Sequence, residues 1–345
     1  MEGAGRTTTA CVTGAGGFVA SWLVKLLLSR YAVHGTVRDP GKLSSESFPL
    51  TLTGAEQRFH LVLVLEGDAK NAHLAALDGA AERLRLFKAD LMDYGSMAAA
   101  VAGCDVVFHV ACPVLTSSVA NPEVDLLAPA LTGTMNVLKA CSEAKVKRVV
   151  VVSSFAAVMV NPSWPQGKAM DEDSWSDVDY CRTTQNWYCL AKTLAELEAL
   201  EYAKKSGLDV VTVCPSLVIG PLLQPTINTS SSMIVDFFKG DNEVMSKIRN
   251  FVDVRDLADA LILVYETPEV SRRYVCTSHA RKVSDVIDLL KSMYPAYKFA
   301  SKFVQVSDEP SFSLRKLEML GWKIRSLEET LRDSVESYRT AGVLD

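Results

Sequence analysis

This chain of 345 residues lacks the patterns that mark several classes of protein. No apolar run approaches the length that spans a bilayer, and the N-terminus does not resemble a signal peptide, so we expect no membrane partner. Lysines and arginines form no cluster beside aromatic residues, and the formal net charge is -5, which argues against nucleic acid as a partner. The hydrophobic content of 48% is ample for a buried core. We therefore expect a globular protein, and no surface pattern indicates an oligomeric state.

The eight cysteines include no CxxC pair and no grouping with histidines at the spacing of a zinc site. This usage fits reduced thiols better than a disulfide scaffold, so we expect a cytoplasmic protein without a metal. His109 lies within the apolar segment 106–110. There we favour a core or cofactor-lining histidine over a metal ligand.

Short β-branched runs alternate with helical stretches along most of the chain. The expected strands are 8–13, 33–37, 83–88, 106–110, 148–152, 210–213 and 274–277. The expected helices include 21–30, 135–144 and 193–205, the last ending at Gly207. Such alternation predicts an α/β protein with a doubly wound parallel-sheet Rossmann fold.

A glycine-rich motif stands between the first expected strand and the first expected helix: Val12-Thr13-Gly14-Ala15-Gly16-Gly17-Phe18-Val19-Ala20. At such a turn Gly14 can supply a tight bend and Gly17 a close approach to a dinucleotide pyrophosphate, with helix N–H groups pointing at it. We expect Gly14, Gly17, Phe18 and Val19 to contact the cofactor. A glycine-rich turn without a ligand is the alternative, but the flanking strand and helix favour binding.

Tyr188 and Lys192 are four residues apart on a helix expected to begin near Asn186, so their side chains face the same way. A neighbouring ammonium stabilises a tyrosinate, which is what general acid catalysis of carbonyl reduction requires. An ordinary Tyr/Lys pair on a solvated helix is the alternative. Ser154 favours catalysis, because it ends the strand segment 149–154 and places a hydroxyl at the carboxyl edge of the sheet.

The alternation weakens after Pro215, and the chain closes with expected helices at 283–293 and 327–341. We therefore expect residues 1–215 and 251–277 to form the dinucleotide-binding domain. Residues 216–250 and 278–345 are expected to form a smaller, mostly helical C-terminal lobe across the carboxyl ends of the strands, with the substrate pocket between.

The whole pattern resembles the extended short-chain dehydrogenase/reductases, and within them the plant cinnamoyl-CoA reductase and dihydroflavonol reductase group. Besides the glycine motif, the segments that carry this resemblance are Gly35-Thr36-Val37-Arg38, Lys88-Ala89-Asp90-Leu91, His109-Val110-Ala111-Cys112-Pro113, Ser153-Ser154, Asn186-Trp187-Tyr188-Cys189-Leu190-Ala191-Lys192 and Gly220-Pro221-Leu222-Leu223-Gln224-Pro225. The resemblance implies that Ser154, Tyr188 and Lys192 are the catalytic triad, with Lys192 also holding the cofactor ribose. It further implies cofactor contacts by Asp90 and Leu91 at the adenine, by Ala111, and by Pro215 to Val218 at the nicotinamide.

Arg38 ends the second expected strand, where a cation accepts the 2′-phosphate of NADP and an acidic residue binds the ribose of NAD. We favour NADP, with Asp39 keeping NAD open. In the family a lysine six positions after this arginine joins it at the phosphate. Residues 41–67 interrupt that spacing and are interpreted as an insertion, with an ordinary variable loop as the alternative. If residues 41–67 are reduced to one glycine, Lys70 takes the position of the lysine that joins Arg38 at the 2′-phosphate. Lys42 is a weaker candidate for this position if Lys70 is displaced.

The resemblance implies a small-molecule substrate and transfer of hydride from NADPH to a hydroxycinnamoyl-CoA thioester, a reaction that releases CoA and the aldehyde. Apolar walls for the phenylpropanoid ring are expected from Val114, Phe155, Trp187, Leu222 and Leu223. The usual signature continues Tyr-Gly-Lys after the cysteine, where this chain has Leu190-Ala191-Lys192.

That departure leaves a ketone or aldehyde reductase of a flavonoid-like or other phenolic substrate open. A non-catalytic dinucleotide-sensing protein is a further alternative, which the complete triad disfavours. Cys181 and Cys189 bracket the site and are either a redox pair or, as we favour, inert thiols.

Overall fold

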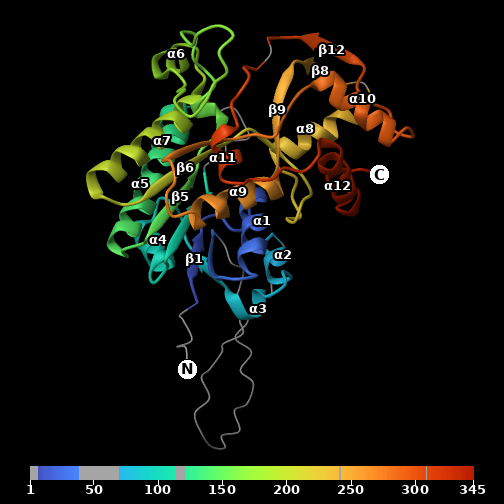
Figure 1. Ribbon diagram of the computed structural model, residues 1–345. Helices are drawn as coiled ribbons and strands as arrows, with labels where there is room; N and C mark the ends of the chain where they lie inside the picture. Colours follow the sequence, from blue (N-terminus) through green and yellow to red (C-terminus); the bar gives the residue numbers. More distant parts are fainter. Residues whose placement is uncertain (1–6, 39–69, 113–120, 241, 308) are drawn as a thin grey trace, which may run out of the picture.

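The structure is a computed structural model that describes residues 7–38, 70–112, 121–240, 242–307 and 309–345. Its centre is a seven-stranded sheet with the order β10-β6-β5-β4-β1-β2-β3, in which every pair is parallel (Figure 1). The strands are β1 Thr9–Val12, β2 Ala32–Val37, β3 Leu84–Lys88, β4 Val106–His109, β5 Arg148–Val152, β6 Val210–Pro215 and β10 Arg273–Cys276. The predicted doubly wound α/β fold is confirmed, and all seven expected strands belong to this sheet.

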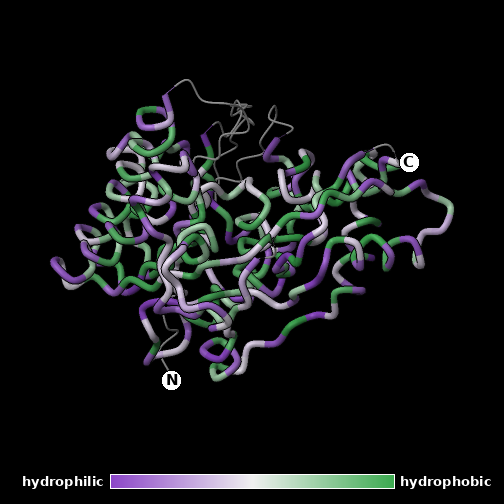
Figure 2. Tube along the Cα trace, turned by 90° about the horizontal axis from the view of Figure 1, so that it is seen from above, coloured by the Kyte–Doolittle hydropathy of each residue, from purple (hydrophilic) through white to green (hydrophobic). Residues whose placement is uncertain are grey.

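Both faces of the sheet are covered by helices. On one face α1 (Phe18–Leu27) and α9 (Val254–Glu266) pack together over a core cluster that includes Val12, Phe108 and Val213. On the other face α4 (Tyr94–Val101), α5 (Ala128–Glu143) and α7 (Trp187–Ser206) cover Val107 and Val149. Continuous apolar strands such as β4 and β6, buried along their whole length, are what a two-faced parallel sheet requires. Seen from above, the hydrophobic segments concentrate toward the interior (Figure 2).

The order of the strands reverses between β4, the central strand of the sheet, and its neighbour β1. In open parallel sheets this reversal opens a crevice at the carboxyl ends of the strands, where ligands bind. The loops after β1, β4, β5 and β6 all meet at this edge because the strands are parallel. Of the site residues predicted above, Gly14, Gly17, Ala111 and Ser154 lie in these loops.

Two expected helices begin earlier than the sequence indicated. α1 begins at Phe18 rather than residue 21, directly after Gly17, and α5 begins at Ala128 rather than residue 135. Proline in the first turn of α5 is compatible with a helix start, since its missing N–H has no partner there. The end of α7 at Gly207, with φ of 75°, is confirmed.

Beyond the central sheet, the C-terminal part of the chain adds two small sheets and several helices. The three-stranded sheet has the order β11-β9-β7, and β12 pairs with β8. The elements are β7 Leu217–Ile219, α8 Thr229–Phe237, β8 Glu243–Ser246, β9 Ile248–Asp253, β11 His279–Lys282, α10 Val283–Met293, β12 Lys302–Gln305, α11 Arg315–Met319 and α12 Leu327–Thr340. A separate core cluster joins α8, α10 and α12 around Ile234, Ile287 and Leu331. Short strands thus accompany the expected helices of the lobe.

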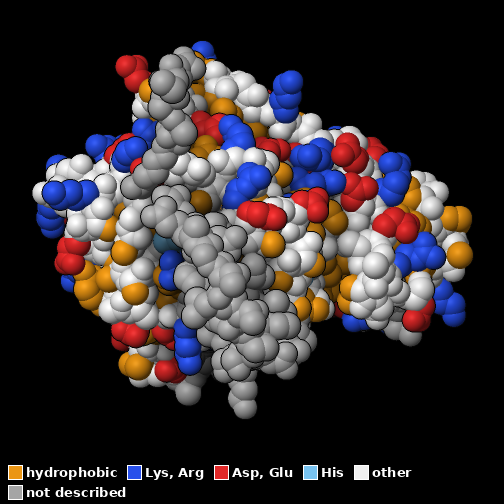
Figure 3. All heavy atoms as spheres, turned by 90° about the horizontal axis from the view of Figure 1, so that it is seen from below, with side chains coloured by type: hydrophobic (Ala, Val, Ile, Leu, Met, Phe, Trp, Pro, Cys, Tyr) orange, Lys and Arg blue, Asp and Glu red, His pale blue; other side chains and the backbone are white. Residues whose placement is uncertain are grey.

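The remaining described elements are short: α2 Ala72–Ala75, α3 Ala80–Arg83, the π-helix η1 Glu123–Leu127, the 3₁₀ helix η2 Phe155–Ala157 and α6 Val178–Thr183. On the described surface, positive and negative side chains lie interspersed when the molecule is viewed from below (Figure 3). Among the described helices, none combines the length and the apolar character needed to cross a bilayer.

Candidate active site

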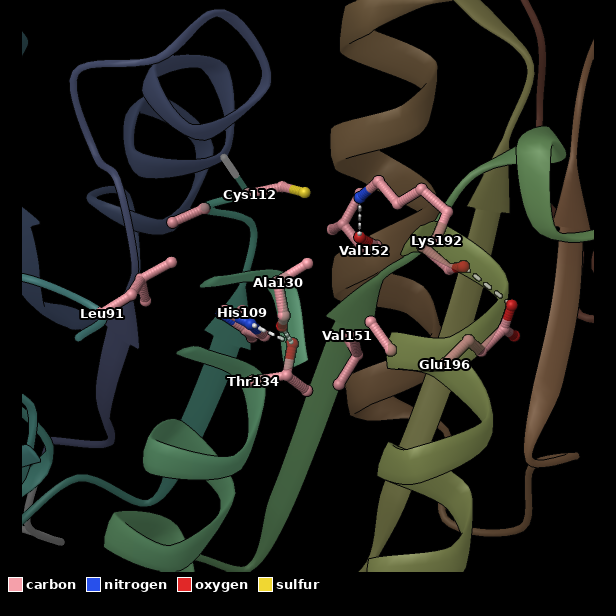
Figure 4. A pocket seen from close by; sticks show the side chains of 12 residues that line it. Leu91, His109, Cys112, Ala130, Thr134, Val151, Val152, Lys192 and Glu196 are labelled. Carbon is pink, nitrogen blue, oxygen red and sulfur yellow. Dashed lines mark hydrogen bonds between the residues drawn. The ribbon is translucent and has the colours of Figure 1, made fainter. Parts of the chain in front are cut away.

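The end of β5 and the first turns of α7 bring the three predicted catalytic residues to one edge of the sheet. Ser154 follows β5 and precedes η2, and Tyr188 and Lys192 lie on α7 one turn apart. The Lys192 Nζ donates a hydrogen bond to the Val152 backbone oxygen at 3.4 Å (Figure 4). Asn186 caps α7 through its side-chain oxygen, which accepts from the Cys189 backbone N–H. The helix start therefore fixes where Tyr188 stands.

The three side chains differ in their exposure in a way that suits separate tasks. Tyr188 is 42% exposed, whereas Lys192 is only 8% exposed. Ser154 is half-buried, and its Oγ accepts from the Ala156 backbone N–H at 3.1 Å. Because a serine hydroxyl has one proton to donate besides its acceptor sites, Ser154 can still donate to a substrate oxygen.

Lys192 projects into a pocket with an empty volume of about 370 Å³, which includes the space at its open mouth. The lining residues come from the loops after β3 and β4, from β4 and β5, and from α5 and α7: Leu91, His109, Ala111, Cys112, Ala130, Thr134, Val151, Val152, Ser153, Lys192, Ala195 and Glu196. Burial alone lowers the pKa of Lys192, but Cys112, Tyr188 and Cys214 raise it, and the net shift is upward. Lys192 is therefore a buried ammonium near neutral pH.

His109 lies in the wall of this pocket between two hydroxyl groups. Its Nδ1 is 3.0 Å from Thr13 Oγ1, and its Nε2 is 3.4 Å from Thr134 Oγ1. Burial, aided by the nearby Lys192 charge, lowers the pKa of His109 to about 3. The imidazole is thus neutral, as the sequence interpretation of a core or cofactor-lining histidine requires. Within the described ranges, no group of three or more histidine, cysteine and acidic side chains could hold a metal ion.

The glycine motif forms the turn between β1 and α1. Gly14 adopts a φ of +67°, and a Cβ there would lie 3.0 Å from the Ala111 Cβ. Thr13 Oγ1 accepts from the Val110 and Ala111 backbone N–H groups, which holds the loop after β4 against this turn. Gly17 is the N-cap of α1 and supplies no side-chain cap, so no cap side chain occupies the first N–H groups of the helix. A close-packed turn with an open helix N-terminus fits a dinucleotide pyrophosphate.

The other predicted cofactor residues surround this turn. Arg38 is exposed directly after β2, and Lys70 is exposed just before α2. Asn71 lies beside the glycine turn, since a Cβ on Gly16 would come 2.1 Å from its Oδ1. Asp90 is exposed and Leu91 lines the pocket. Phe18 and Val19 begin α1, Pro215 ends β6, and Val218 lies in β7.

The predicted substrate walls are less concentrated. The Phe155 ring is buried and packs on Phe312 with ring centroids 4.0 Å apart. Leu222 and Leu223 pack toward the core cluster of α1, and the Leu222 N–H donates to Ser337 Oγ on α12. Neither these residues nor Trp187, which is half-buried at the start of α7, line the pocket that holds Lys192. Val114, Asp39, Lys42 and the expected insertion at 41–67 lie outside the described residues.

Sequence reasoning missed three polar residues of the pocket: Cys112, Thr134 and Glu196. Glu196 was accessible from the pattern, because it follows Lys192 by four residues on the same helix. Thr134 and Cys112 gave no such signal. Cys181 and Cys189 are buried free thiols in one cluster. Burial raises the pKa of both, and that of Cys189 reaches about 12 with a contribution from Cys181, which fits inert thiols.

A glycine turn at the reversal point of a parallel sheet, beside a Ser/Tyr/Lys constellation, defines a nicotinamide-dependent oxidoreductase. The chain belongs to the NAD dependent epimerase/dehydratase family, whose model matches residues 10–276. The extended short-chain dehydrogenase/reductase resemblance is thereby confirmed. Cinnamoyl-CoA reductase 1 of Petunia hybrida is 42% identical over 340 residues, which cover 97% of this chain and 93% of the relative.

Solved structures agree with this assignment. Vestitone reductase from alfalfa (Medicago sativa L.) superposes with a TM-score of 0.76 at 28% identity, covering 97% of this chain and 99% of that chain. Gre2 from Candida albicans, solved in complex with NADPH, superposes with a TM-score of 0.77 at 25% identity, covering 97% of this chain and 99% of that chain.

Proposed function

We propose that the protein is an NADPH-dependent reductase of a phenylpropanoid carbonyl, with a hydroxycinnamoyl-CoA thioester as the substrate and the aldehyde as the product. The observation that carries the proposal is the buried Lys192 ammonium one turn from the exposed Tyr188, at the strand end that precedes Ser154. The 42% identity to a cinnamoyl-CoA reductase, over nearly the full length of both chains, supports the substrate class. We place the protein in the cytoplasm, in keeping with its eight reduced cysteines.

The cofactor, when bound, supplies a hydride to the carbonyl carbon. The Tyr188 hydroxyl gives its proton to the carbonyl oxygen, and the Lys192 ammonium stabilises the tyrosinate that remains. The Ser154 hydroxyl donates a hydrogen bond to the same oxygen and polarises the carbonyl. With a thioester, the resulting hemithioacetal releases CoA as a thiol and leaves the aldehyde.

The residues that would hold the cofactor lie along the carboxyl edge of the sheet. Arg38 would meet the 2′-phosphate, with Lys70 as a second cation from beside the glycine turn. The dinucleotide-binding domain would comprise residues 1–215 and 251–277, and the lobe of 216–250 and 278–345 would cover the substrate. The remaining contacts are assigned to Gly14, Gly17, Phe18, Val19, Asp90, Leu91, Ala111, Lys192, Pro215 and Val218, and the ring walls to Val114, Phe155, Trp187, Leu222 and Leu223.

The departure at Leu190-Ala191 is compatible with a thioester substrate. Leu190 is fully buried and Ala191 is 3% exposed, and both belong to the core cluster between α6 and α7. Neither residue lines the pocket. A ketone or aldehyde reductase of a flavonoid-like or other phenolic substrate remains the second candidate, which the vestitone reductase of alfalfa at 28% identity supports.

A substrate panel separates these functions. NADPH oxidation would be measured with hydroxycinnamoyl-CoA thioesters, phenolic aldehydes and dihydroflavonols under the same conditions. The proposal expects the highest kcat/KM with the thioesters. Turnover confined to dihydroflavonols or phenolic aldehydes would assign the second function, and no turnover with any carbonyl would reject a reductase.

A further inference from the structure

Glu196 is a buried carboxylate in the wall of the catalytic pocket. It is 1% exposed and lies one turn beyond Lys192 on α7. The Ser153 hydroxyl donates to its Oε2 at 2.7 Å, and the Thr212 hydroxyl donates to its Oε1 at 2.6 Å. The Cys214 thiol donates to it at 3.3 Å. The donors come from β5's end and from β6, so one carboxylate connects the catalytic helix to two strands.

Arg273 on β10 neutralises this carboxylate. Its Nε and Nη2 donate to Glu196 at 2.8 and 3.2 Å, while its remaining N–H groups donate to the Glu172, Ser174 and Ala157 backbone oxygens. The guanidinium also stacks on Trp175, with 3.6 Å between its central carbon and the ring centroid. A buried ion pair is tolerated only when its hydrogen bonds are this complete.

The end of β5 is consequently held to α7 at two successive residues. Val152 accepts from Lys192 through its backbone oxygen, and Ser153 donates to Glu196 through its side chain. The next residue is Ser154. The distance of Ser154 from Tyr188 and Lys192 therefore depends on these two attachments. A displacement of about 1 Å of a catalytic group can lower the rate about 100-fold.

We propose that Glu196, held by Arg273, is a positioning residue that fixes Ser154 against Tyr188 and Lys192 through the Ser153 hydroxyl. The inference rests on the proposed function for its kinetic readout. It assigns different consequences to the two hydroxyls that donate to one carboxylate. The Ser153 bond sets the catalytic strand end, whereas the Thr212 bond on β6 contributes to stability alone.

Ser153→Ala and Thr212→Val form a matched pair for the kinetic test, because each removes one buried hydroxyl donor of Glu196. Ser153→Ala is expected to lower kcat about tenfold or more, with KM for NADPH and for the thioester within about twofold. Thr212→Val is expected to keep kcat within about twofold. Glu196→Gln should lower kcat at least as far as Ser153→Ala does. The double variant that combines Ser153→Ala with Glu196→Gln should lose no more kcat than Glu196→Gln alone. Equal kcat losses in the matched pair, an unchanged kcat in Ser153→Ala, or multiplied losses in the double variant would overturn the inference.

Hydrogen–deuterium exchange provides a readout that needs no substrate. The Ala157, Val158 and Met159 N–H groups bond to the Ser154 and Phe155 oxygens, so their exchange reports on the turn after β5. Ser153→Ala should speed exchange of the segment 154–159 about tenfold, and Thr212→Val should leave it within about twofold. If the wild type reduced no carbonyl while these exchange rates held, the proposed function would fail and the positioning by Glu196 would stand. Equal exchange in the two variants would reject the positioning even in an active enzyme.

Discussion

The side-chain nitrogen of Lys192 and the backbone oxygen of Val152 are joined by a hydrogen bond of 3.4 Å, which ties the catalytic helix to the last residue of β5. The bond keeps a buried ammonium near the exposed Tyr188. Since Ser154 lies two residues beyond Val152, this bond helps to relate all three predicted catalytic groups. The proposed chemistry rests on this arrangement of helix α7 on the end of strand β5.

Tyr188→Phe is expected to reduce turnover by about 10²- to 10⁴-fold, because the phenol supplies the proton. NADPH affinity, measured by fluorescence titration, should stay nearly unchanged. Tyr180→Phe on α6 is the matched control, since Tyr180 is 43% exposed compared with 42% for Tyr188. Near-full steady-state activity of Tyr188→Phe would remove the tyrosine from the mechanism.

Arg38→Asp is expected to shift cofactor preference from NADP towards NAD. The carboxylate would repel the 2′-phosphate and can accept from ribose hydroxyls, and the lost charge-assisted bonds are worth about 1.5–3 kcal/mol, or roughly 10- to 150-fold in affinity. Titration of the variant with both cofactors gives the ratio directly. An unchanged ratio would mean that Arg38 does not discriminate between the cofactors.

The sequence predicted the sheet well because the central strands β4, β5 and β6 are mostly apolar and largely buried between the two helical layers. The starts of the helices were predicted less accurately. The π-helix η1 directly precedes α5 and a proline lies in its first turn, so the helical periodicity is interrupted where α5 begins. The placement of Ser154 after a strand end and of Tyr188 and Lys192 on one helix could be predicted from the apolar strand pattern and the helix spacing, while their catalytic roles stay a prediction. Long-range packing could not be read from local pattern: the contact of Phe155 with Phe312 joins residues that are distant in the chain.

His109 should make stability depend on pH in a predictable direction. Its pKa is about 3 in the folded state, whereas an unfolded histidine titrates near 6.5, so protonation favours the unfolded chain as the pH falls below 6.5. This group alone should lower the free energy of unfolding by about 2 kcal/mol between pH 7 and pH 5. Urea unfolding at both pH values tests it. His109→Gln, which cannot be protonated, should show a smaller drop, and an equal drop would contradict the assigned burial effect.

Deleting residues 42–67 is expected to raise solubility and tighten NADPH binding. The deletion places Lys70 six positions after Arg38, the spacing of family members, and removes the β-prone apolar run Leu61-Val62-Leu63-Val64-Leu65. Soluble yield and NADPH titration measure the two effects. A deletion variant that unfolds or loses cofactor affinity would show that the segment belongs to the fold.

The destination of the hydride tests the central claim most directly. The enzyme would be incubated with a 4-hydroxycinnamoyl-CoA thioester and NADPH deuterated at C4 in the transferred position, and the products analysed by mass spectrometry and a thiol assay. We predict one deuterium on the aldehyde carbon and one equivalent of free CoA thiol per NADPH oxidised, both lost in Tyr188→Phe. NADPH oxidation without release of thiol, or deuterium on any other carbon, would contradict reduction of the thioester carbonyl.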